Sequence, residues 1–298
     1  MSTTEVRLLK RCVVIGGAGA VGGMFARLLA SSGAHVTVAD PAGDGITDDA
    51  TAPGPALIAE LSRADLVLVA LPERAALAAL PRLTPHLRPG TLVADTLSVK
   101  RQVTAALRAT AGIEAVSLNP MFAPSLGLPG NPVAAVVVHG GPAASELLDL
   151  LAGWGGRPVP VGAEEHDRLT AAAQVITHAT VLGFGLALGE LDVSARELAD
   201  LAPPPHTTLL ALLARIASGS PEVYWDVQAA HPHGAGARAA LATGLRRLAD
   251  LVDRGDEAGF EAALDGIRTA LGDQLAPHAD LCADLFAHLP TRSRNEAT

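Results

Sequence analysis

Two polar segments follow apolar, strand-like runs and could bind a small molecule. Ser98 and Lys100 come directly after the run TLVADT at 91–96, and Asn119 follows the run AVSL at 115–118. Carboxyl ends of neighbouring parallel strands meet at one edge of a sheet, where doubly wound folds bind their ligands. Ser98 could therefore hydrogen-bond a substrate or cofactor, and Lys100 could bind a carboxylate. Alternatively, Ser98 caps the helix that follows and Lys100 begins it.

A second group of polar residues lies in apolar, helix-like sequence. Gln174 and His178 are four residues apart, hence on one face of a helix. A lone histidine on such a helix is more often a core residue than a ligand, but a glutamine one turn away favours a polar pocket. Arg215 lies near the end of a strongly apolar helix. Its permanent charge needs a carboxylate from the chain or a ligand if it is buried, or else it stabilises the helix C-terminus.

The sequence VVIGGAGAVGGMFARLL contains a binding motif. Gly17, Gly19 and Gly22 fit the pattern GxGxxG between a strand and a helix. The first glycine permits a tight turn, the second lets a pyrophosphate approach the backbone, and the third allows close helix packing. The helix N-terminus attracts the phosphate charge, so the motif predicts dinucleotide binding. A glycine-rich turn with a purely structural role is the alternative.

Asp40 indicates which dinucleotide is bound. It ends the next strand, HVTVAD, at the distance expected for a carboxylate that binds a ribose 2′-hydroxyl. A carboxylate would repel a 2′-phosphate, so NAD is predicted rather than NADP. An ordinary turn aspartate before Pro41 is the alternative.

Motifs typical of other enzyme classes are missing. The sequence has no GxSxG elbow, HExxH or P-loop, so hydrolase and phosphotransferase activities lack support. Its two cysteines, Cys12 and Cys282, are far apart and in no zinc-binding spacing, so neither a metal site nor a disulfide is predicted. The remaining polar residues indicate redox chemistry on a carboxylated substrate.

The elements that position these residues change in type along the chain. Up to about residue 162, β-branched apolar runs alternate with helix-like segments, which is typical of a mainly parallel sheet covered on both faces. Beyond residue 163, Ala- and Leu-rich sequence with 3.6-residue periodicity predicts helices alone. We therefore expect an α/β fold: a Rossmann-type doubly wound sheet in a dinucleotide-binding domain over 1–162, followed by an all-helical domain over 163–298. The predicted strands are 13–16, 35–40, 65–71, 91–96, 115–118 and 133–139.

Composition and charge exclude several partners. Apolar residues make up 49% and charged ones 18% of the chain, and the net charge of -9 offers no electrostatic footprint for nucleic acid. The stretch 169–188 is long and apolar enough to resemble a membrane span, but its glutamine, histidine and threonines favour a buried helix of a soluble protein. The N-terminus lacks the pattern of a signal peptide. A cytoplasmic protein without a nucleic-acid or membrane partner is expected.

Five segments together resemble the prephenate dehydrogenases, especially the dehydrogenase portion of the bifunctional bacterial mutase-dehydrogenases. They are GGAGAVGGMFARLLASSG, ADTLSVK, NPMFAPS, EEHDRLTAAAQVITHAT and ARIASGSPEVYWDVQ, in the same order and with similar spacing over nearly the whole chain. The resemblance implies an NAD-dependent oxidative decarboxylation of a cyclohexadienyl pyruvate. Hydride leaves ring carbon 4, carbon dioxide leaves carbon 1, and the ring becomes aromatic. The resemblance also implies a homodimer formed through the helical domain.

The same resemblance assigns roles to the candidate residues. Ser98 would lie near the nicotinamide and the carbon-4 substituent, and Arg215 would bind a substrate carboxylate. Thr207 stands where the bifunctional enzymes carry an arginine, and the adjacent His206 could compensate. The further pocket residues implied are Lys100, Gln174 and His178.

Asn119 departs from the family pattern. The family motif is usually HPMFGP, whose histidine accepts a hydrogen bond from the substrate's 4-hydroxyl and helps hydride to leave, whereas this chain has Asn119 and Ala123. An asparagine is no base near neutral pH, although its oxygen accepts hydrogen bonds. Loss of a general base commonly costs about 100- to 10,000-fold in rate. A substrate with an amine on carbon 4 avoids this cost, because nitrogen stabilises the cation as an iminium.

We therefore expect the branch of the family that oxidises 4-amino-4-deoxyprephenate to 4-aminophenylpyruvate, on the way to 4-aminophenylalanine and antibiotics. An ordinary prephenate dehydrogenase of tyrosine biosynthesis, or an enzyme for a related cyclohexadienyl substrate, is the alternative. A catalytically inactive NAD-binding homologue acting as sensor or scaffold is a third possibility. Loss of the histidine supports it, but retention of Ser98, Lys100 and Arg215 argues against it.

Overall fold

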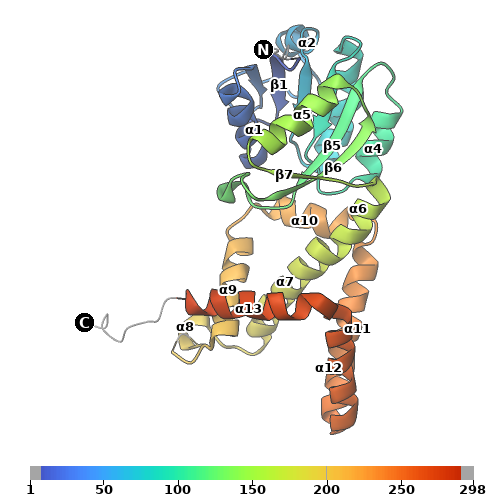
Figure 1. Cartoon of the computed structure of the whole chain (residues 1–298). Helices are drawn as coiled ribbons and strands as arrows, with labels where there is room; N and C mark the ends of the chain where they lie inside the picture. Colours follow the sequence, from blue (N-terminus) through green and yellow to red (C-terminus); the bar gives the residue numbers. More distant parts are fainter. Residues whose placement is uncertain (1–7, 199, 290–298) are drawn as a thin grey trace, which may run out of the picture. The chain divides into compact units, whose positions relative to one another are not determined.

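The computed structural model describes residues 8–198 and 200–289 (Figure 1). The first seven residues of the N-terminal segment, in which we looked for a signal peptide, lie outside this range. The described chain forms two compact units. Within the described residues, the first comprises 8–173 and 222–234, and the second comprises 174–198, 200–221 and 235–289.

This division differs from the predicted boundary after residue 162, because two later segments bond to the sheet unit. The carboxylate of Asp167 accepts a hydrogen bond from the backbone N–H of Lys100 at 2.8 Å. The carboxylate of Asp226 accepts one from the backbone N–H of Glu73 at 3.2 Å. Such contacts join residues far apart in sequence, so periodicity could not reveal them.

A seven-stranded sheet forms the centre of the first unit, in the order β2-β1-β3-β4-β5-β6-β7. All neighbours are parallel except β5 and β6, which confirms the predicted mainly parallel sheet. The chain leaves β1 for β2 on one side and returns to β3 on the other, so a switch point lies at the carboxyl end of β1. The strands are β1 (Arg11–Ile15), β2 (His35–Ala39), β3 (Leu66–Val69), β4 (Leu92–Asp95), β5 (Glu114–Pro120), β6 (Pro132–His139) and β7 (Arg157–Pro160).

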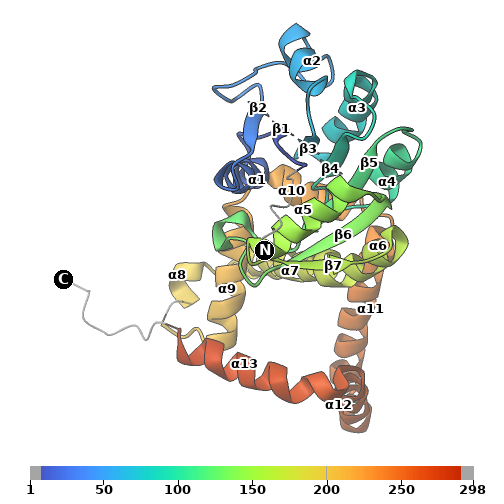
Figure 2. The same cartoon turned by 45° about the horizontal axis from the view of Figure 1, so that its top comes forward.

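Helices cover both faces of this sheet, and the alternation of side chains along the strands sets two hydrophobic cores. Val14 and Leu68 point to one face and pack with α1 and α5. Val13 and Val67 point to the other face and pack with α2, α3 and α4, two of which lie beside β3 and β4 in Figure 2. Strands buried on both faces explain the continuous apolar runs of the sequence.

The helices of the first unit mostly begin at a carboxylate. Asp48, Asp226, Asp167 and Glu114 each accept a backbone N–H from the first turn of α2, α3, α4 and α5, respectively. The helices are α1 (Ala20–Ser31), α2 (Pro55–Leu61), α3 (Glu73–Leu83), α4 (Arg101–Arg108), α5 (Pro142–Gly153), α6 (Ala163–Thr170) and α10 (Pro221–Ala229), with short 3-10 turns η1 (Thr84–His86) and η2 (Pro124–Leu126).

The second unit is helical, as predicted. Its helices α7 and α9 pack closely, since a Cβ on Gly185 would lie 2.7 Å from the side chain of Leu213. The π-helical segment η3 (Ala171–Ile176) runs from α6 into α7. The helices are α7 (Thr177–Glu190), α8 (Ala195–Leu198), α9 (Pro204–Ala217), α11 (Gly234–Asp253), α12 (Glu257–Leu271) and α13 (Leu275–Ala287), with the 3-10 turn η4 (Gly272–Gln274).

The continuous helical stretch Ala163–Glu190 corrects one prediction. Its mean hydropathy of 1.5 and its length would allow it to cross a membrane, and only 17% of its most apolar window is buried within the chain. We predicted a buried helix here. Instead, apolar side chains such as Leu186, which is 75% exposed, have no cover within the described chain.

Candidate functional site

The loop between β1 and α1 requires glycine at two positions. Gly16 has a φ of 79°, and a Cβ there would lie 2.3 Å from the carbonyl oxygen of Ala70. A Cβ on Gly22 would lie 2.3 Å from the carbonyl oxygen of Gly16, so α1 can approach the loop only with glycine at this position, as the motif predicted. Gly16 was not among the predicted residues, although its place directly after the strand was a signal.

The N-terminus of α1 suits a pyrophosphate. Gly19 precedes the first turn, which carries neither an acidic residue nor a side-chain cap within the described chain. Its backbone N–H groups and the small residues Gly17 and Gly19 leave room for phosphate oxygens at the switch point of the sheet. These features fit a bound dinucleotide.

Asp40 lies beside this loop, as predicted. Its Oδ2 accepts a hydrogen bond from the backbone N–H of Ala18 at 3.0 Å, and its Oδ1 accepts one from Ala42 at 2.9 Å. The carboxylate therefore fixes both the glycine loop and its own turn. Each carboxylate oxygen has two lone pairs, so Asp40 can still accept hydrogen bonds from a ribose.

The carboxyl edge of the sheet carries the second group of candidate residues. Neighbouring parallel strands β4 and β5 bring the segments of Ser98 and Asn119 to the same edge, as the sequence predicted. Glu73, which the sequence analysis did not identify, follows β3 at this edge. Lys100, Asn119 and Glu73 are buried at this edge, whereas Ser98 is only partly buried.

Lys100 belongs to the core, which corrects its predicted contact with substrate. Its side chain is fully buried, and Nζ donates to the carbonyl oxygens of Leu97 at 2.6 Å and Leu118 at 2.7 Å. Oδ1 of Asp95 lies 3.5 Å away. Burial lowers the pKa of Lys100, against the opposing attraction of Asp95. The three partners use its three donors, so Lys100 joins the ends of β4 and β5.

The N-terminus of α4 is capped from α6 and not by Ser98. Asp167 Oδ1 accepts the backbone N–H of Lys100 at 2.8 Å, and Oδ2 accepts that of Arg101 at 3.0 Å. Burial alone would raise the pKa of Asp167, but hydrogen bonds from His166 and these two N–H groups hold it below its usual value of 3.8. The N-cap residue of α4 is Lys100, and its side chain makes no capping hydrogen bond. Asp167 caps the helix instead, so the alternative role of Ser98 as a helix cap is excluded.

Asn119 is buried and hydrogen-bonded to His166. The distance from Asn119 Nδ2 to His166 Nε2 is 3.0 Å, and that from His166 Nδ1 to Asp167 Oδ1 is 2.8 Å. All three side chains are at most 2% exposed. The sequence did not predict roles for His166 and Asp167; the available signal was a His-Asp pair a few residues before Gln174.

Glu73 is a further buried acid of this edge. Burial raises its pKa to about 7, and the negative charges of Asp226 and Asp167 add to the effect while Lys100 opposes it. Its Oε1 is buried and receives no hydrogen bond from the described residues. Glu73 therefore exchanges a proton near neutral pH.

The second unit holds the other predicted substrate residues. Gln174 lies in the π-helical segment and His178 in the first turn of α7, so their spacing is not that of a regular helix. The Oε1 atom of Gln174 is buried without a hydrogen-bond donor among the described residues. Burial and the nearby charge of Arg215 lower the pKa of His178. The lowered pKa favours the neutral form of His178.

Arg215 and His206 lie on α9, which packs against α7. Arg215 is exposed in the last turn of α9, so no protein carboxylate is needed to compensate its charge. The ring of His206 packs edge-on against Phe184 at 5.5 Å. Within this unit the structure thus groups Gln174, His178, His206 and Arg215 on two packed segments, while Asn119 and Ser98 belong to the other unit.

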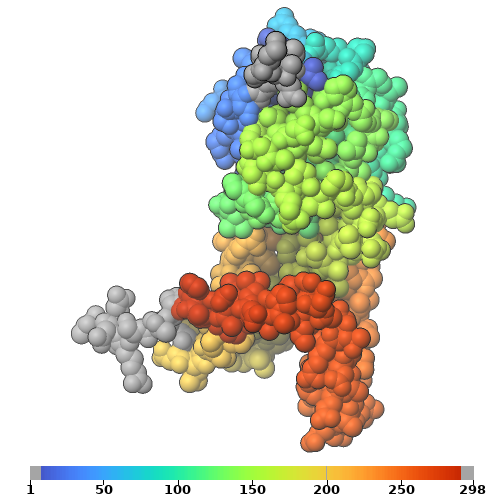
Figure 3. All heavy atoms as spheres, viewed as in Figure 1, coloured from blue at the N-terminus to red at the C-terminus, as the bar shows by residue number. Residues whose placement is uncertain are grey.

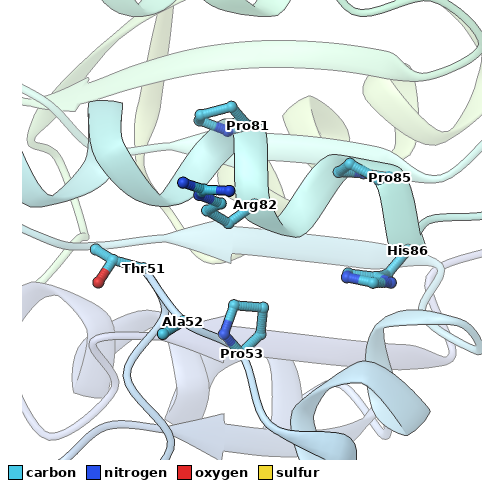
Figure 4. A pocket seen from close by; sticks show the side chains of 7 residues that line it. All are labelled: Thr51, Ala52, Pro53, Pro81, Arg82, Pro85 and His86. Atoms are coloured by element: carbon cyan, nitrogen blue, oxygen red, sulfur yellow. The ribbon is translucent and has the colours of Figure 1, made fainter.

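A separate groove of about 540 Å³ lies on the sheet unit (Figure 4). None of the candidate residues lines it. Helix α3 starts at the carboxyl edge of the sheet and ends at the opposite edge, and Pro81 and Arg82 from its last turn form one wall. The groove is therefore separate from the candidate site. Its lining residues are Thr51, Ala52, Pro53, Pro81, Arg82, Pro85 and His86.

The glycine loop at a switch point, followed by a polar strand edge, defines a nucleotide-binding dehydrogenase. Residues 37–131 match the nucleotide-binding domain of prephenate dehydrogenase. The chain is also 53% identical over 287 residues to the 4-amino-4-deoxyprephenate dehydrogenase of Streptomyces pristinaespiralis, covering 94% of this chain and 97% of that one. The protein belongs to the prephenate dehydrogenase family.

Two more distant proteins are also similar to this chain. The T-protein of Haemophilus influenzae is 26% identical over 266 residues, covering 89% of this chain and 68% of the relative. The crystal structure of prephenate dehydrogenase from Aquifex aeolicus, in complex with hydroxyphenyl propionate and NAD+, has a TM-score of 0.71 at 18% identity and covers 89% of this chain and 98% of that one. The predicted Rossmann-type fold, dehydrogenase class and family are therefore confirmed.

Proposed function

We propose that the protein catalyses the NAD-dependent oxidative decarboxylation of 4-amino-4-deoxyprephenate to 4-aminophenylpyruvate. The observation that carries the proposal is the amide of Asn119 at the carboxyl edge, in a chain 53% identical to a relative named for this substrate. The product leads to 4-aminophenylalanine and to antibiotics made from it.

The chemistry explains why an amide suffices. Hydride leaves ring carbon 4 while the lone pair of the neutral amine forms a C=N bond. The bond from carbon 1 to its carboxylate then breaks, its electron pair completes the aromatic ring, and carbon dioxide departs. Gly17, Gly19, Gly22 and Asp40 would hold NAD, which would supply the hydride acceptor. Starting from the neutral amine, no base is needed to take a proton.

The side chains at the carboxyl edge have supporting roles in this proposal. Asn119 accepts an N–H of the substrate amine and stabilises the positive charge that develops on nitrogen as hydride leaves. Ser98 lies near the nicotinamide and the carbon-4 substituent. With a 4-hydroxyl in place of the amine, hydride loss would create a strongly acidic protonated ketone, for which Asn119 offers no base.

The second unit supplies groups for the two carboxylates of the substrate. Arg215 is exposed and permanently charged, so it can bind a carboxylate bidentately. Gln174, His178 and His206 add hydrogen bonds in this proposal, with His178 neutral because of its lowered pKa. His206 compensates for the arginine that Thr207 replaces. Lys100 has no part in binding, since its Nζ is bonded within the core.

A cytoplasmic homodimer completes the proposal. Large apolar side chains are exposed along α12 and α13, the orange and red segments of Figure 3. Burial of such a face against a second copy would remove them from water. These side chains are Phe260, Leu264, Ile267, Leu271, Leu275, Leu281 and Leu285.

A direct assay tests the proposed reaction. The protein is incubated with NAD and either 4-amino-4-deoxyprephenate or prephenate, and NADH absorbance is followed. We expect a larger kcat/KM for the amine. Equal or better turnover of prephenate would contradict the proposed substrate, and silence with both would favour a sensor or scaffold.

A further inference from the structure

A chain of three buried side chains leads from α4 to Asn119. Backbone N–H groups of Lys100 and Arg101 hold both oxygens of Asp167, at 2.8 and 3.0 Å. Asp167 Oδ1 contacts His166 Nδ1 at 2.8 Å, and His166 Nε2 contacts Asn119 Nδ2 at 3.0 Å. Asp167 is therefore the fixed end of the chain, and the amide of Asn119 is its free end.

The order of donors and acceptors along this chain follows from Asp167. An ionised carboxylate only accepts hydrogen bonds, so Nδ1 of His166 must donate to it. In a neutral imidazole, Nε2 then carries a lone pair and accepts the N–H of Asn119 Nδ2. A flipped amide would set Oδ1 against that lone pair, which is repulsive. The imidazole thus selects one of the two orientations of the amide.

The free end of the chain is the amide oxygen. Asn119 Oδ1 receives no hydrogen bond from the described residues, whereas Nδ2 is occupied by His166. An acceptor is the group that the amine of the substrate needs.

We infer that His166, held by Asp167, is a positioning residue that orients the amide of Asn119 so that its oxygen accepts the substrate's 4-amino group. This inference rests on the proposed function, because it takes Asn119 to face that amine. The imidazole does not exchange a proton with the substrate. It removes the orientation in which Nδ2 would face the developing positive charge and repel it.

Two substitutions of His166 separate orientation from packing. His166→Leu removes the acceptor at similar volume, and we expect kcat for the amine to fall ~10- to 100-fold, because a misplaced group near the reacting atoms costs up to about 100-fold. KM should change less than about threefold. His166→Gln restores an acceptor and should recover most of the rate.

His231→Leu is the matched control. His231 is also a buried histidine of the sheet unit, and its Nε2 contacts Thr170 Oγ1 at 3.1 Å. Its side chain thus lies near His166 and Asp167 but makes no hydrogen bond to either of them or to Asn119. We expect it to lower the unfolding temperature without changing the ratio of kcat values for amine and prephenate. An unchanged kcat and ratio in His166→Leu would overturn the inference, and so would an equal kinetic effect of His231→Leu.

A spectroscopic measurement tests the chain without substrate. Two-bond ¹H–¹⁵N spectra of the full-length protein should show His166 as the neutral tautomer with its proton on Nδ1. Asp167→Leu removes the acceptor of Nδ1, so the proton should no longer be held on Nδ1, and kcat for the amine should fall. An Nε2-protonated or doubly protonated His166 in the unaltered protein would overturn the inference. A preference for prephenate would instead contradict the proposed function and leave the spectrum unchanged.

Discussion

In the proposed function, the single side chain of Asn119 sets the choice of substrate, and a substitution there tests this role. Asn119→His restores the imidazole of the family motif, whose free nitrogen accepts the proton of a 4-hydroxyl. We expect kcat for prephenate to rise about 100-fold, the lower end of the range for a general base, and the preference for the amine to fall. Both are measured from NADH formation.

The control is the other departure in the same motif. Ala123→Gly should leave the ratio of kcat values for the two substrates unchanged, since residue 123 carries no group able to accept a proton. If Asn119→His does not alter that ratio, substrate preference is set by other residues.

Glu73 predicts how stability depends on pH. Its pKa of about 7 in the folded protein lies above the ordinary value of 4.5, so the folded state binds the proton more tightly. The contribution of Glu73 to the free energy of unfolding is fully present below about pH 4.5. It is lost as the pH rises through 7, by up to about 3 kcal/mol. Glu73→Gln should abolish this loss. Urea unfolding at pH 5 and pH 8 measures it, and an equal pH dependence in both proteins would contradict the assignment.

The positions of site residues could be predicted where they depend on the local sequence, but not where they depend on contacts between residues far apart in the chain. Asn119 and Ser98 follow recognisable strands, so their edge could be predicted. Lys100 stands in the same pattern, but the acceptors that draw it into the core include Leu118, which the sequence does not reveal as a partner. The contact from His166 to Asn119 spans 47 residues and leaves no periodic signal.

At the scale of elements, the ends of β4 and β5 are joined by one buried ammonium group. Lys100→Met removes a charge, leaves two carbonyl oxygens without the ammonium donor, and leaves the charge of Asp95 without its cation. We expect a loss of about 3 kcal/mol in the free energy of unfolding, measured by urea denaturation. Lys10→Met, at an exposed lysine, is the control and should have little effect. If the Lys100→Met protein is as stable as the unaltered one and has a raised KM, Lys100 binds substrate after all.

The strands were predicted wherever β-branched runs are buried on both faces, and one was missed. The run RPVP of β7 contains two prolines, which argue against a strand in the interior of a sheet. An edge strand needs hydrogen bonds on one side only, so β7 accommodates them next to β6. The helix after residue 163 was predicted at the correct position, but the structure does not bury it as expected. A sequence does not show whether the residues that pack on an apolar helix belong to the same chain.

At the scale of the whole molecule, the exposed apolar face of α12 and α13 predicts self-association. Leu264→Glu with Leu285→Glu places two charges on that face, and we expect the altered protein to sediment as a monomer while the unaltered one sediments as a dimer. Leu126→Glu, at an exposed leucine of the sheet unit, is the control and should remain dimeric. A monomeric unaltered protein would contradict the prediction.

The carboxylates at the helix ends have a consequence for how an anionic ligand is directed to the sheet. Helices α2, α3, α4 and α5 each have the partial positive charge of their first turn neutralised by an acid of the chain itself. Among these described helices, α1 alone keeps that charge uncompensated by a side chain in its first turn. Among α1 to α5, the N-terminus of α1 is therefore the one that attracts a diphosphate, and its place after β1 selects where and in which direction a dinucleotide lies along the strands.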